Sequence, residues 1–223
     1  MKKYDLRKIS VTAMFSAVAF LCTFIFRFKV MFLTFDLKDA IISIVSLLFG
    51  PLYGIFSAGI VAFFELISFS ETGIYGMLMN FISSATFALT CGIIYRYKRS
   101  FFGAILAVSL SVVTVTSVMM VANIFITPYY MGVKTSEVIT LLPKLLFPFN
   151  ICKSLINAAS VLIIYKPITN ALKRTGLINK TKDNKSIFSI KSVVLIIVSL
   201  VIIILTILFL ILSLGGSFEL FRS

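Results

Sequence analysis

The chain has 223 residues, of which 60% are apolar and 13% are charged, and its mean hydropathy is +1.09. These values exclude an ordinary soluble domain, which is about 45–50% apolar and about 25% charged. The net charge of +13 would indicate nucleic-acid binding in a soluble protein, whereas in a membrane protein basic residues mark the cytoplasmic ends of helices.

Seven apolar segments follow one another along the chain, and most approach the length of about 17–25 residues that a membrane helix needs. They cover residues 9–27, 39–50, 52–69, 77–95, 101–127, 143–166 and 193–212. The second is short for a full span, and an aromatic external loop, residues 28–38, precedes it. Pro128 is expected to end the fifth. The seventh has only Ser199 and Thr206 as polar residues, which predicts a peripheral helix that faces lipid.

Several common chemistries lack the residues they need. The sequence has no histidine, which excludes His-based acid–base catalysis, and it contains no P-loop for nucleotide binding. Cys22, Cys91 and Cys152 lie far apart inside apolar segments, so we expect buried free thiols. We therefore expect no metal site, no catalytic residues and no cofactor.

The distribution of basic residues predicts the orientation in the membrane. With a cytoplasmic N-terminus and alternating spans, 14 of the 21 lysines and arginines lie in cytoplasmic segments, while Asp36, Asp39, Glu71 and Glu137 lie outside. The opposite orientation would violate the positive-inside rule. Seven spans then leave the C-terminus external. The cytoplasmic cations are Lys2, Lys3, Arg7, Lys8, Arg96, Lys98, Arg99, Lys166, Lys173, Arg174, Lys180, Lys182, Lys185 and Lys191.

Three polar side chains lie inside the sixth apolar segment. Asn150, Lys153 and Asn157 are spaced i, i+3 and i+7, so they share one face of a helix. A lysine within a span requires a carboxylate, a carbonyl or a polar ligand as its partner. Glu65 in the third segment is either that partner or a side chain that extends to the outer surface, and the sequence leaves both alternatives open.

Polar residues of other segments lie at the same level of the membrane. Asn80 and Asn123 lie near the outer ends of the fourth and fifth segments, and Thr34, Asp36 and Asp39 lead into the second. Single polar residues in spans commonly serve only as contacts between helices. Their convergence in the outer half of the bundle favours a ligand site.

Aromatic side chains accompany these amides near the outer ends of the segments. Amides pair with ring donors and acceptors and aromatic faces stack, so the set suits a flat, largely uncharged heteroaromatic ligand. Aromatic residues are also enriched at membrane interfaces without any ligand, which is the alternative for each of them. They are Phe28, Phe32, Phe35, Tyr75, Tyr129, Tyr130, Phe147 and Phe149.

Small residues recur at four-residue spacing in two places. Ala13 and Ala17 do so in the first segment, and Gly50 and Gly54 at the second turn. This spacing allows another helix to approach closely. It serves either internal packing or the docking of a separate membrane partner.

Five motifs together resemble the substrate-binding S components of energy-coupling factor (ECF) vitamin transporters, and most specifically the riboflavin type. The resemblance covers residues 8–172 in the expected order, and Asp-Leu-Lys-Asp together with Phe-Pro-Phe-Asn-x-x-Lys is its most specific part. The motifs are Leu-Thr-Phe-Asp-Leu-Lys-Asp (33–39), Leu-Phe-Gly-Pro-Leu-Tyr-Gly (48–54), Met-Asn-Phe (79–81), Ala-Asn-Ile-Phe-Ile-Thr-Pro-Tyr-Tyr (122–130) and Phe-Pro-Phe-Asn-Ile-Cys-Lys (147–153).

The resemblance implies an all-α membrane protein with a six-helix S-component core plus one additional C-terminal transmembrane helix. Residues 1–172 would form the substrate-binding domain, 173–191 a basic cytoplasmic linker, and 192–223 the extra helix with a short external tail.

The resemblance also implies a vitamin pocket near the outer surface, covered by the first external loop. Asn123, Asn150 and Lys153 match family positions that hydrogen-bond the flavin. Some relatives carry Asp at position 150, and the amide here keeps an acceptor oxygen but lacks the charge for a direct ion pair with Lys153. The candidate substrate-binding residues are Leu33, Thr34, Asp36, Asn80, Asn123, Tyr129, Asn150 and Lys153.

The expected function is that of a non-enzymatic, substrate-binding subunit of an ATP-driven vitamin importer in the cell membrane. Riboflavin would be the transported ligand and not a cofactor. A transmembrane coupling subunit, docked on Ala13 and Ala17, and two ATPase subunits would be its partners.

Three alternatives stay open at this stage. In the first, the ligand is another vitamin or a flavin phosphate such as FMN. A phosphate would require cations, and Arg27, Lys29 and Lys38 lie near the expected pocket mouth. In the second, the chain is an intramembrane enzyme with a Ser/Lys catalytic dyad. The candidate residues Lys153 and Ser154 are adjacent, however, and therefore point to different helix faces. In the third, the chain is a structural or sensory membrane protein without ATPase partners.

Overall fold

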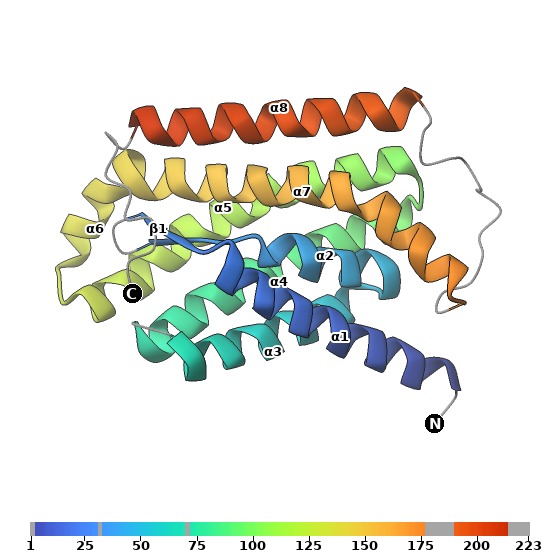
Figure 1. Cartoon of the computed structure of the whole chain (residues 1–223). Coiled ribbons are helices and arrows are strands. Elements are labelled where there is room, and N and C mark those ends of the chain that lie inside the picture. The colour runs from blue at the N-terminus through green and yellow to red at the C-terminus, as the bar shows by residue number, and fades with distance from the viewer. Residues whose placement is uncertain (1–2, 31–32, 70–71, 177–189, 214–223) are drawn as a thin grey trace.

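The computed structural model describes residues 3–30, 33–69, 72–176 and 190–213, and almost all of them are helical (Figure 1). The elements in chain order are α1 (Lys3–Ile25), β1 (Phe28–Val30), β2 (Leu33–Phe35), α2 (Lys38–Phe49), α3 (Pro51–Phe69), α4 (Gly73–Tyr97), α5 (Phe101–Met131), α6 (Thr135–Leu141), the π-helical turn η1 (Leu142–Leu146), α7 (Phe147–Arg174) and α8 (Ile190–Ser213).

Five helical stretches are long and apolar enough to cross a membrane. They are Leu6–Ile25, Pro51–Ser68, Gly73–Tyr97, Phe102–Met131 and Thr135–Leu172. The predicted class of helical membrane protein is thereby confirmed, whereas the division into six core helices and one extra helix stays a prediction. Each of the seven predicted apolar segments corresponds to a long helix or to α2.

Helix α2 is short because it lies inside the bundle. Its 12 residues extend about 18 Å at 1.5 Å per residue, less than the roughly 30 Å hydrocarbon core. Every residue from Lys38 to Leu47 is buried, so α2 meets protein instead of lipid on all sides. A buried helix of this kind does not have to match the thickness of the bilayer.

The expectation that Pro128 ends the fifth segment is wrong. Helix α5 continues through Pro128 to Met131 and ends at Gly132, whose φ of 66° lies in the left-handed region that favours glycine. The backbone N–H of Gly132 donates to the carbonyl of Pro128 at 2.9 Å. A proline removes one hydrogen bond from a helix, and here the following residues still continue it.

The loop before α2 contains a small β-hairpin that the sequence analysis did not predict. Strands β1 and β2 pair antiparallel, with Phe28 opposite Phe35 and Lys29 opposite Thr34. The pairing fixes Thr34 and Phe35 relative to the start of α2. The hairpin therefore positions one wall of the site described below.

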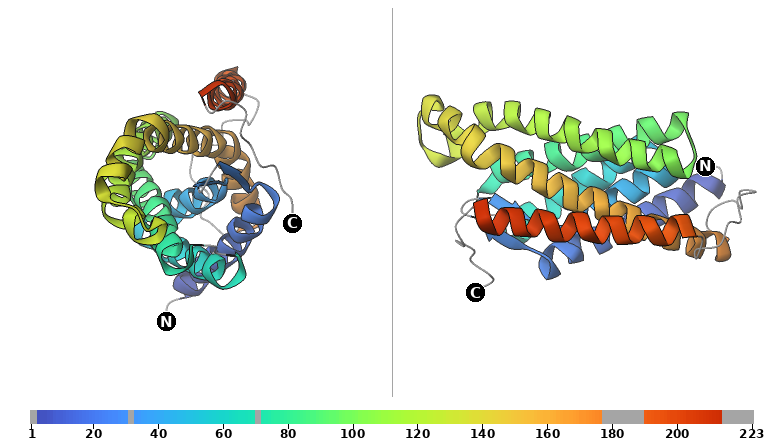
Figure 2. Two further views of the ribbon diagram at one scale, coloured as in Figure 1. Left: turned by 90° about the vertical axis from the view of Figure 1, so that its left-hand side faces the viewer. Right: turned by 90° about the horizontal axis from the view of Figure 1, so that it is seen from above.

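The core is formed where α4 packs against α2, α3 and α5, and where α7 closes the ring against α5 and α2. Phe87 and Ala107 belong to one apolar cluster, and Ile42 and Val61 to a second. Viewed along the bundle, α8 lies outside this ring of helices and beside α7 (Figure 2). Much of its apolar surface is exposed, as predicted for a peripheral helix.

Candidate functional site

A cavity opens at one end of the bundle, where α2, α4 and α7 begin and α1, α3 and α5 end. The hairpin strand β2 forms part of its wall. It encloses about 1000 Å³, counting the part open to solvent. The residues that line it are Thr23, Arg27, Leu33, Thr34, Asp36, Lys38, Glu65, Leu66, Thr72, Gly76, Met77, Met79, Asn80, Ser83, Met119, Asn123, Tyr130, Phe149, Asn150 and Lys153.

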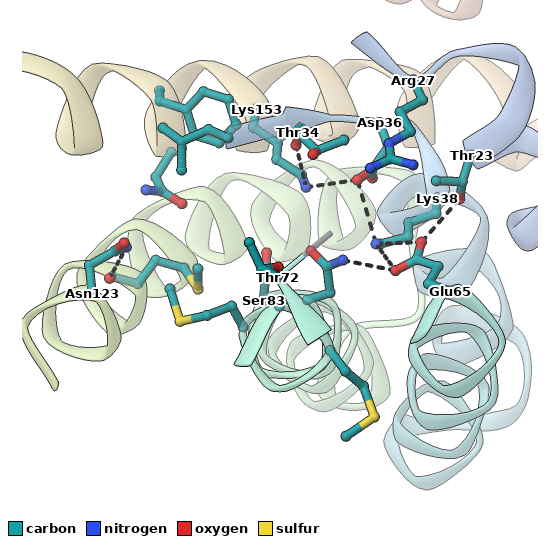
Figure 3. A pocket seen from close by; sticks show the side chains of 18 of the residues that line it. Thr23, Arg27, Thr34, Asp36, Lys38, Glu65, Thr72, Ser83, Asn123 and Lys153 are labelled. Carbon is teal, nitrogen blue, oxygen red and sulfur yellow. Dashed lines mark hydrogen bonds and ion pairs between the residues drawn. The ribbon is translucent and has the colours of Figure 1, made fainter. Parts of the chain in front are cut away.

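Lys153 on α7 is paired with Asp36, the residue that follows β2 (Figure 3). Its Nζ lies 2.9 Å from Asp36 Oδ2 and donates to the backbone carbonyl of Thr34 at 3.2 Å. A buried ammonium needs such partners because transfer from water into protein is costly. This pair answers the question that the sequence left open, since the partner of Lys153 is neither Glu65 nor residue 150.

A second charged cluster centres on Glu65 of α3. Its two carboxylate oxygens accept from Lys38 Nζ at 2.6 and 2.7 Å. Asn80 Nδ2 donates to the same carboxylate at 2.9 Å, and Thr23 Oγ1 does so at 3.3 Å. Figure 3 shows Thr23 and Lys38 on either side of Glu65. Both alternatives that the sequence offered for Glu65 are therefore wrong, because it is buried and its lysine partner is Lys38.

Lys38 connects the two clusters, since its Nζ also lies 3.5 Å from Asp36 Oδ2. The sequence analysis placed Lys38 at the pocket mouth as a cation for a phosphate. It is instead buried between two carboxylates, which occupy its ammonium group. Four of the charged side chains of the lining, two lysines and two acids, thus compensate one another within the protein.

The amides of Asn123 and Asn150 are held partly by their own helices. Asn123 Nδ2 donates to the carbonyl of Met119 at 2.7 Å, and its Oδ1 accepts from Thr127 at 2.8 Å. Asn150 Nδ2 donates to the carbonyl of Leu146 at 2.7 Å, and no described residue donates to its Oδ1. These bonds orient both amides at the cavity wall and leave hydrogen-bonding capacity for a ligand.

Asn157 shares a helix face with Lys153, as predicted, but it serves the backbone of the neighbouring segment. Its Oδ1 accepts from the N–H of Ala40 at 2.9 Å, and its Nδ2 donates to the carbonyl of Asp36 at 3.0 Å. Asn157 therefore fixes the start of α2 against α7. It is not among the cavity-lining residues.

Seven of the eight candidate substrate-binding residues line this one cavity: Leu33, Thr34, Asp36, Asn80, Asn123, Asn150 and Lys153. Tyr129 does not. Its ring is 73% exposed and stacks on Tyr75 with 6.2 Å between ring centroids, while the next residue, Tyr130, lines the cavity. Successive residues of a helix point about 100° apart, and in α5 it is Tyr130 that lines the cavity.

Several lining residues were not singled out from the sequence, among them Thr23, Ser83 and Met119. Helical spacing could have identified these three, because Ser83 follows Asn80 by three positions and Met119 precedes Asn123 by four. Thr23 of α1 likewise precedes Arg27, which the sequence analysis placed near the pocket mouth, by four positions. Its place depends on the packing of α1 against α3.

Ala13 and Ala17, the candidate docking residues, lie on an exposed face of α1, and neither lines the cavity. Met14, Val18 and Leu21 on the same helix are exposed as well. The helix thus presents an apolar surface with small residues in it.

Comparisons with known proteins agree with this architecture. The family model "ECF transporter, substrate-specific component" matches residues 7–169. The riboflavin transporter RibU of Staphylococcus aureus (strain TCH60) is 30% identical over 178 residues, which cover 75% of this chain and 93% of the relative.

The similarity extends to a solved structure, that of the S component of a bacterial ECF transporter. The two superpose with a TM-score of 0.66 at 29% sequence identity, over 76% of this chain and 99% of the other. The family match ends within α7, so α8 lies beyond it.

Proposed function

The chain belongs to the substrate-specific components of ECF transporters, and from this premise we propose that it binds riboflavin in the cavity at the hairpin end of the bundle. It is a multi-pass membrane protein and a transporter component, not an enzyme. The riboflavin specificity, the direction of transport and the partner subunits are parts of the proposal.

The observation that carries the proposal is the internal pairing of charges in the cavity. Lys153 pairs with Asp36 and Lys38 with Glu65, so amides and hydroxyls remain for a ligand. Riboflavin is neutral and has ring carbonyls, a ring N–H and ribityl hydroxyls, which such groups can satisfy. A wrong ligand that leaves one buried group unpaired loses about 1–3 kcal/mol.

One oxygen atom of the site favours a ligand that carries hydrogen-bond donors. Asp36 Oδ1 is buried at the cavity wall and accepts no hydrogen bond within the described part of the chain. A buried carboxylate oxygen without a donor is costly. A ligand hydroxyl or ring N–H would satisfy it, and we assign Asp36 to the ligand contacts together with Asn80, Asn123, Asn150, Lys153, Leu33 and Thr34.

The same pairing argues against a flavin phosphate as the preferred ligand. A phosphate requires cationic donors, and Lys38 is buried between Asp36 and Glu65. Arg27 also lines the cavity, and the side chain of Lys29 lies outside the described residues. FMN is therefore the second candidate and not the first.

We further propose import driven by a coupling subunit and two ATPase subunits, with Ala13 and Ala17 as the docking positions. The support is the exposure of both alanines on α1 at the spacing that lets a helix approach closely. The positive-inside rule supports a cytoplasmic N-terminus and an external cavity. In this orientation the cavity receives the vitamin from outside.

The test is a titration of the detergent-purified full chain with riboflavin, followed by quenching of flavin fluorescence. We expect saturable binding at micromolar ligand or below, with weaker competition by FMN and none by thiamine. Stronger competition by FMN would select the second candidate. Absence of saturable flavin binding, with another compound found by mass spectrometry in the purified protein, would contradict both.

A further inference from the structure

A second cavity lies at the opposite end of the helices that form the candidate site. Helices α2 and α4 begin at the first cavity and end at the second. The second cavity encloses about 500 Å³, counting the part open to solvent, and it is lined by Ser46, Leu47, Leu48, Phe49, Gly50, Gly92, Tyr95, Arg96 and Arg99. The two cavities share no lining residue.

Two glycines maintain the shape of this second cavity. Gly50 turns the chain between α2 and α3 at φ 109°, and a side chain there would meet nothing within 4 Å. Gly92 packs tightly on the floor, since a Cβ would lie 2.2 Å from Ser46 Oγ and 2.9 Å from the backbone of Pro51. Helix α4 therefore packs closely at Gly92 against the turn between α2 and α3, while the space around Gly50 stays open.

The cations of the cavity are Arg96 in the last turn of α4 and Arg99 three residues later. No residue in the described part of the chain forms an ion pair or a hydrogen bond with either guanidinium, and the lining contains no carboxylate. A guanidinium group is planar, and its N–H donors are spaced to match two phosphate oxygens. Two neighbouring guanidinium groups therefore make a strong anion site.

The surroundings of the cavity place it at a bilayer surface. Arg96 and Arg99 flank the point where α4 ends and α5 begins, and both of those helices are long and apolar enough to cross a membrane. Tyr97 beside them is 89% exposed, and aromatic side chains of this kind concentrate at the headgroup level. Basic pockets between membrane helices are suited to anionic lipid headgroups.

We propose that this second cavity binds a phosphate group, with Arg96 and Arg99 as its donors. The phosphate is carried by an anionic lipid headgroup or is a free phosphate ion, and the experiment below separates these sources. The site is independent of the identity of the vitamin, because it shares no residue with the first cavity.

The experiment is native mass spectrometry of the full chain released from nanodiscs of phosphatidylcholine containing one fifth phosphatidylglycerol. We expect wild-type protein to retain phosphatidylglycerol in preference to phosphatidylcholine, and the double substitution Arg96→Gln with Arg99→Gln to lower that preference about tenfold. A second arm adds inorganic phosphate to protein in detergent. Phosphate adducts that require both arginines, without retained phosphatidylglycerol, would identify free phosphate as the ligand and would equally support the site.

The matched control is Lys98→Gln with Arg174→Gln, which removes the same charge near the same end of the bundle but outside the cavity. If the two double variants retain phosphatidylglycerol equally and also form phosphate adducts equally, the proposal is overturned and only general attraction to basic residues is left. Equal binding by wild type and the arginine variant in both arms would also overturn it. The single substitution Arg99→Gln, in the turn after α4, provides a variant without any change in a helix, and circular dichroism confirms the fold of each protein.

Discussion

Lys153 and Asp36 lie 117 positions apart in the sequence and form an ion pair with 2.9 Å between Nζ and Oδ2. The pair joins α7 to the residue between the hairpin and α2, so it connects one wall of the cavity to another. Because Lys153 also donates to the carbonyl of Thr34, a single ammonium holds strand β2 against α7.

Loss of both members of this pair should destabilise the protein by less than the sum of the two single losses. Replacing Asp36 with Ala leaves a buried ammonium whose nearest carboxylate is gone, which costs about 3–5 kcal/mol. We expect the double substitution Asp36→Ala with Lys153→Met to cost clearly less than the sum of the single substitutions. Thermal unfolding in detergent without ligand measures this, and additive effects would contradict the pairing.

Glu65→Gln should also lower the unfolding temperature. The carboxylate accepts from Lys38, Asn80 and Thr23 at once, and a neutral amide provides only one acceptor oxygen for the three donors. We expect a loss of about 2–4 kcal/mol, since a buried lysine loses its nearest partner. Glu137→Gln on the exposed face of α6 is the control and should change little. An equal effect of both would contradict the assigned role of Glu65.

Two glycines that lie inside helices provide a matched pair for packing. A methyl group at Gly92 would meet Ser46 Oγ at 2.2 Å, whereas at Gly59 the nearest atom is a ring carbon of Phe81 at 3.6 Å. Gly92→Ala should therefore destabilise by about 1–3 kcal/mol through overpacking. Gly59→Ala should be neutral or stabilising by up to about 1 kcal/mol through helix propensity. Thermal unfolding of both variants tests the packing of α4 on the α2–α3 turn.

Asn123→Ala should weaken riboflavin binding if the proposed function is correct. The expected loss is about 1–3 kcal/mol for one hydrogen-bonding group at the ligand, or roughly fivefold to 150-fold in Kd. Asn170→Ala, a substitution of the same type far along α7 from the cavity, should leave Kd unchanged. Fluorescence titration gives both values, and equal affinities for the two variants would remove Asn123 from the site.

Removal of α8 should leave the vitamin site intact. The helix packs on α7 outside the ring, contributes no residue to the cavity and lies beyond the family match. We expect a chain ending at Gly176 to insert in the membrane and to bind riboflavin with unchanged Kd. A large loss of affinity in a truncated protein that still folds by circular dichroism would show that α8 supports the core.

The sequence by itself determined the class of the protein and most of the candidate site. Apolar runs of membrane length predict helices, because backbone N–H and C=O groups inside a bilayer must be hydrogen-bonded within the protein. This reasoning located α1, α3, α4, α5 and α7. Helical spacing within one segment placed Lys153 and Asn150 on a common face. The motifs shared with a family identified seven residues that line one cavity.

The tertiary structure decided which charges are partners. Sequence spacing relates residues within one helix, whereas the pairs Lys153–Asp36 and Lys38–Glu65 join different elements across the bundle. It also decided that Tyr130 and not Tyr129 faces the cavity, because the rotation of α5 about its axis depends on how α5 packs against α4 and α7. A charged residue in the sequence can contact a ligand, a lipid or another side chain, and the residues that surround it in the tertiary structure decide which.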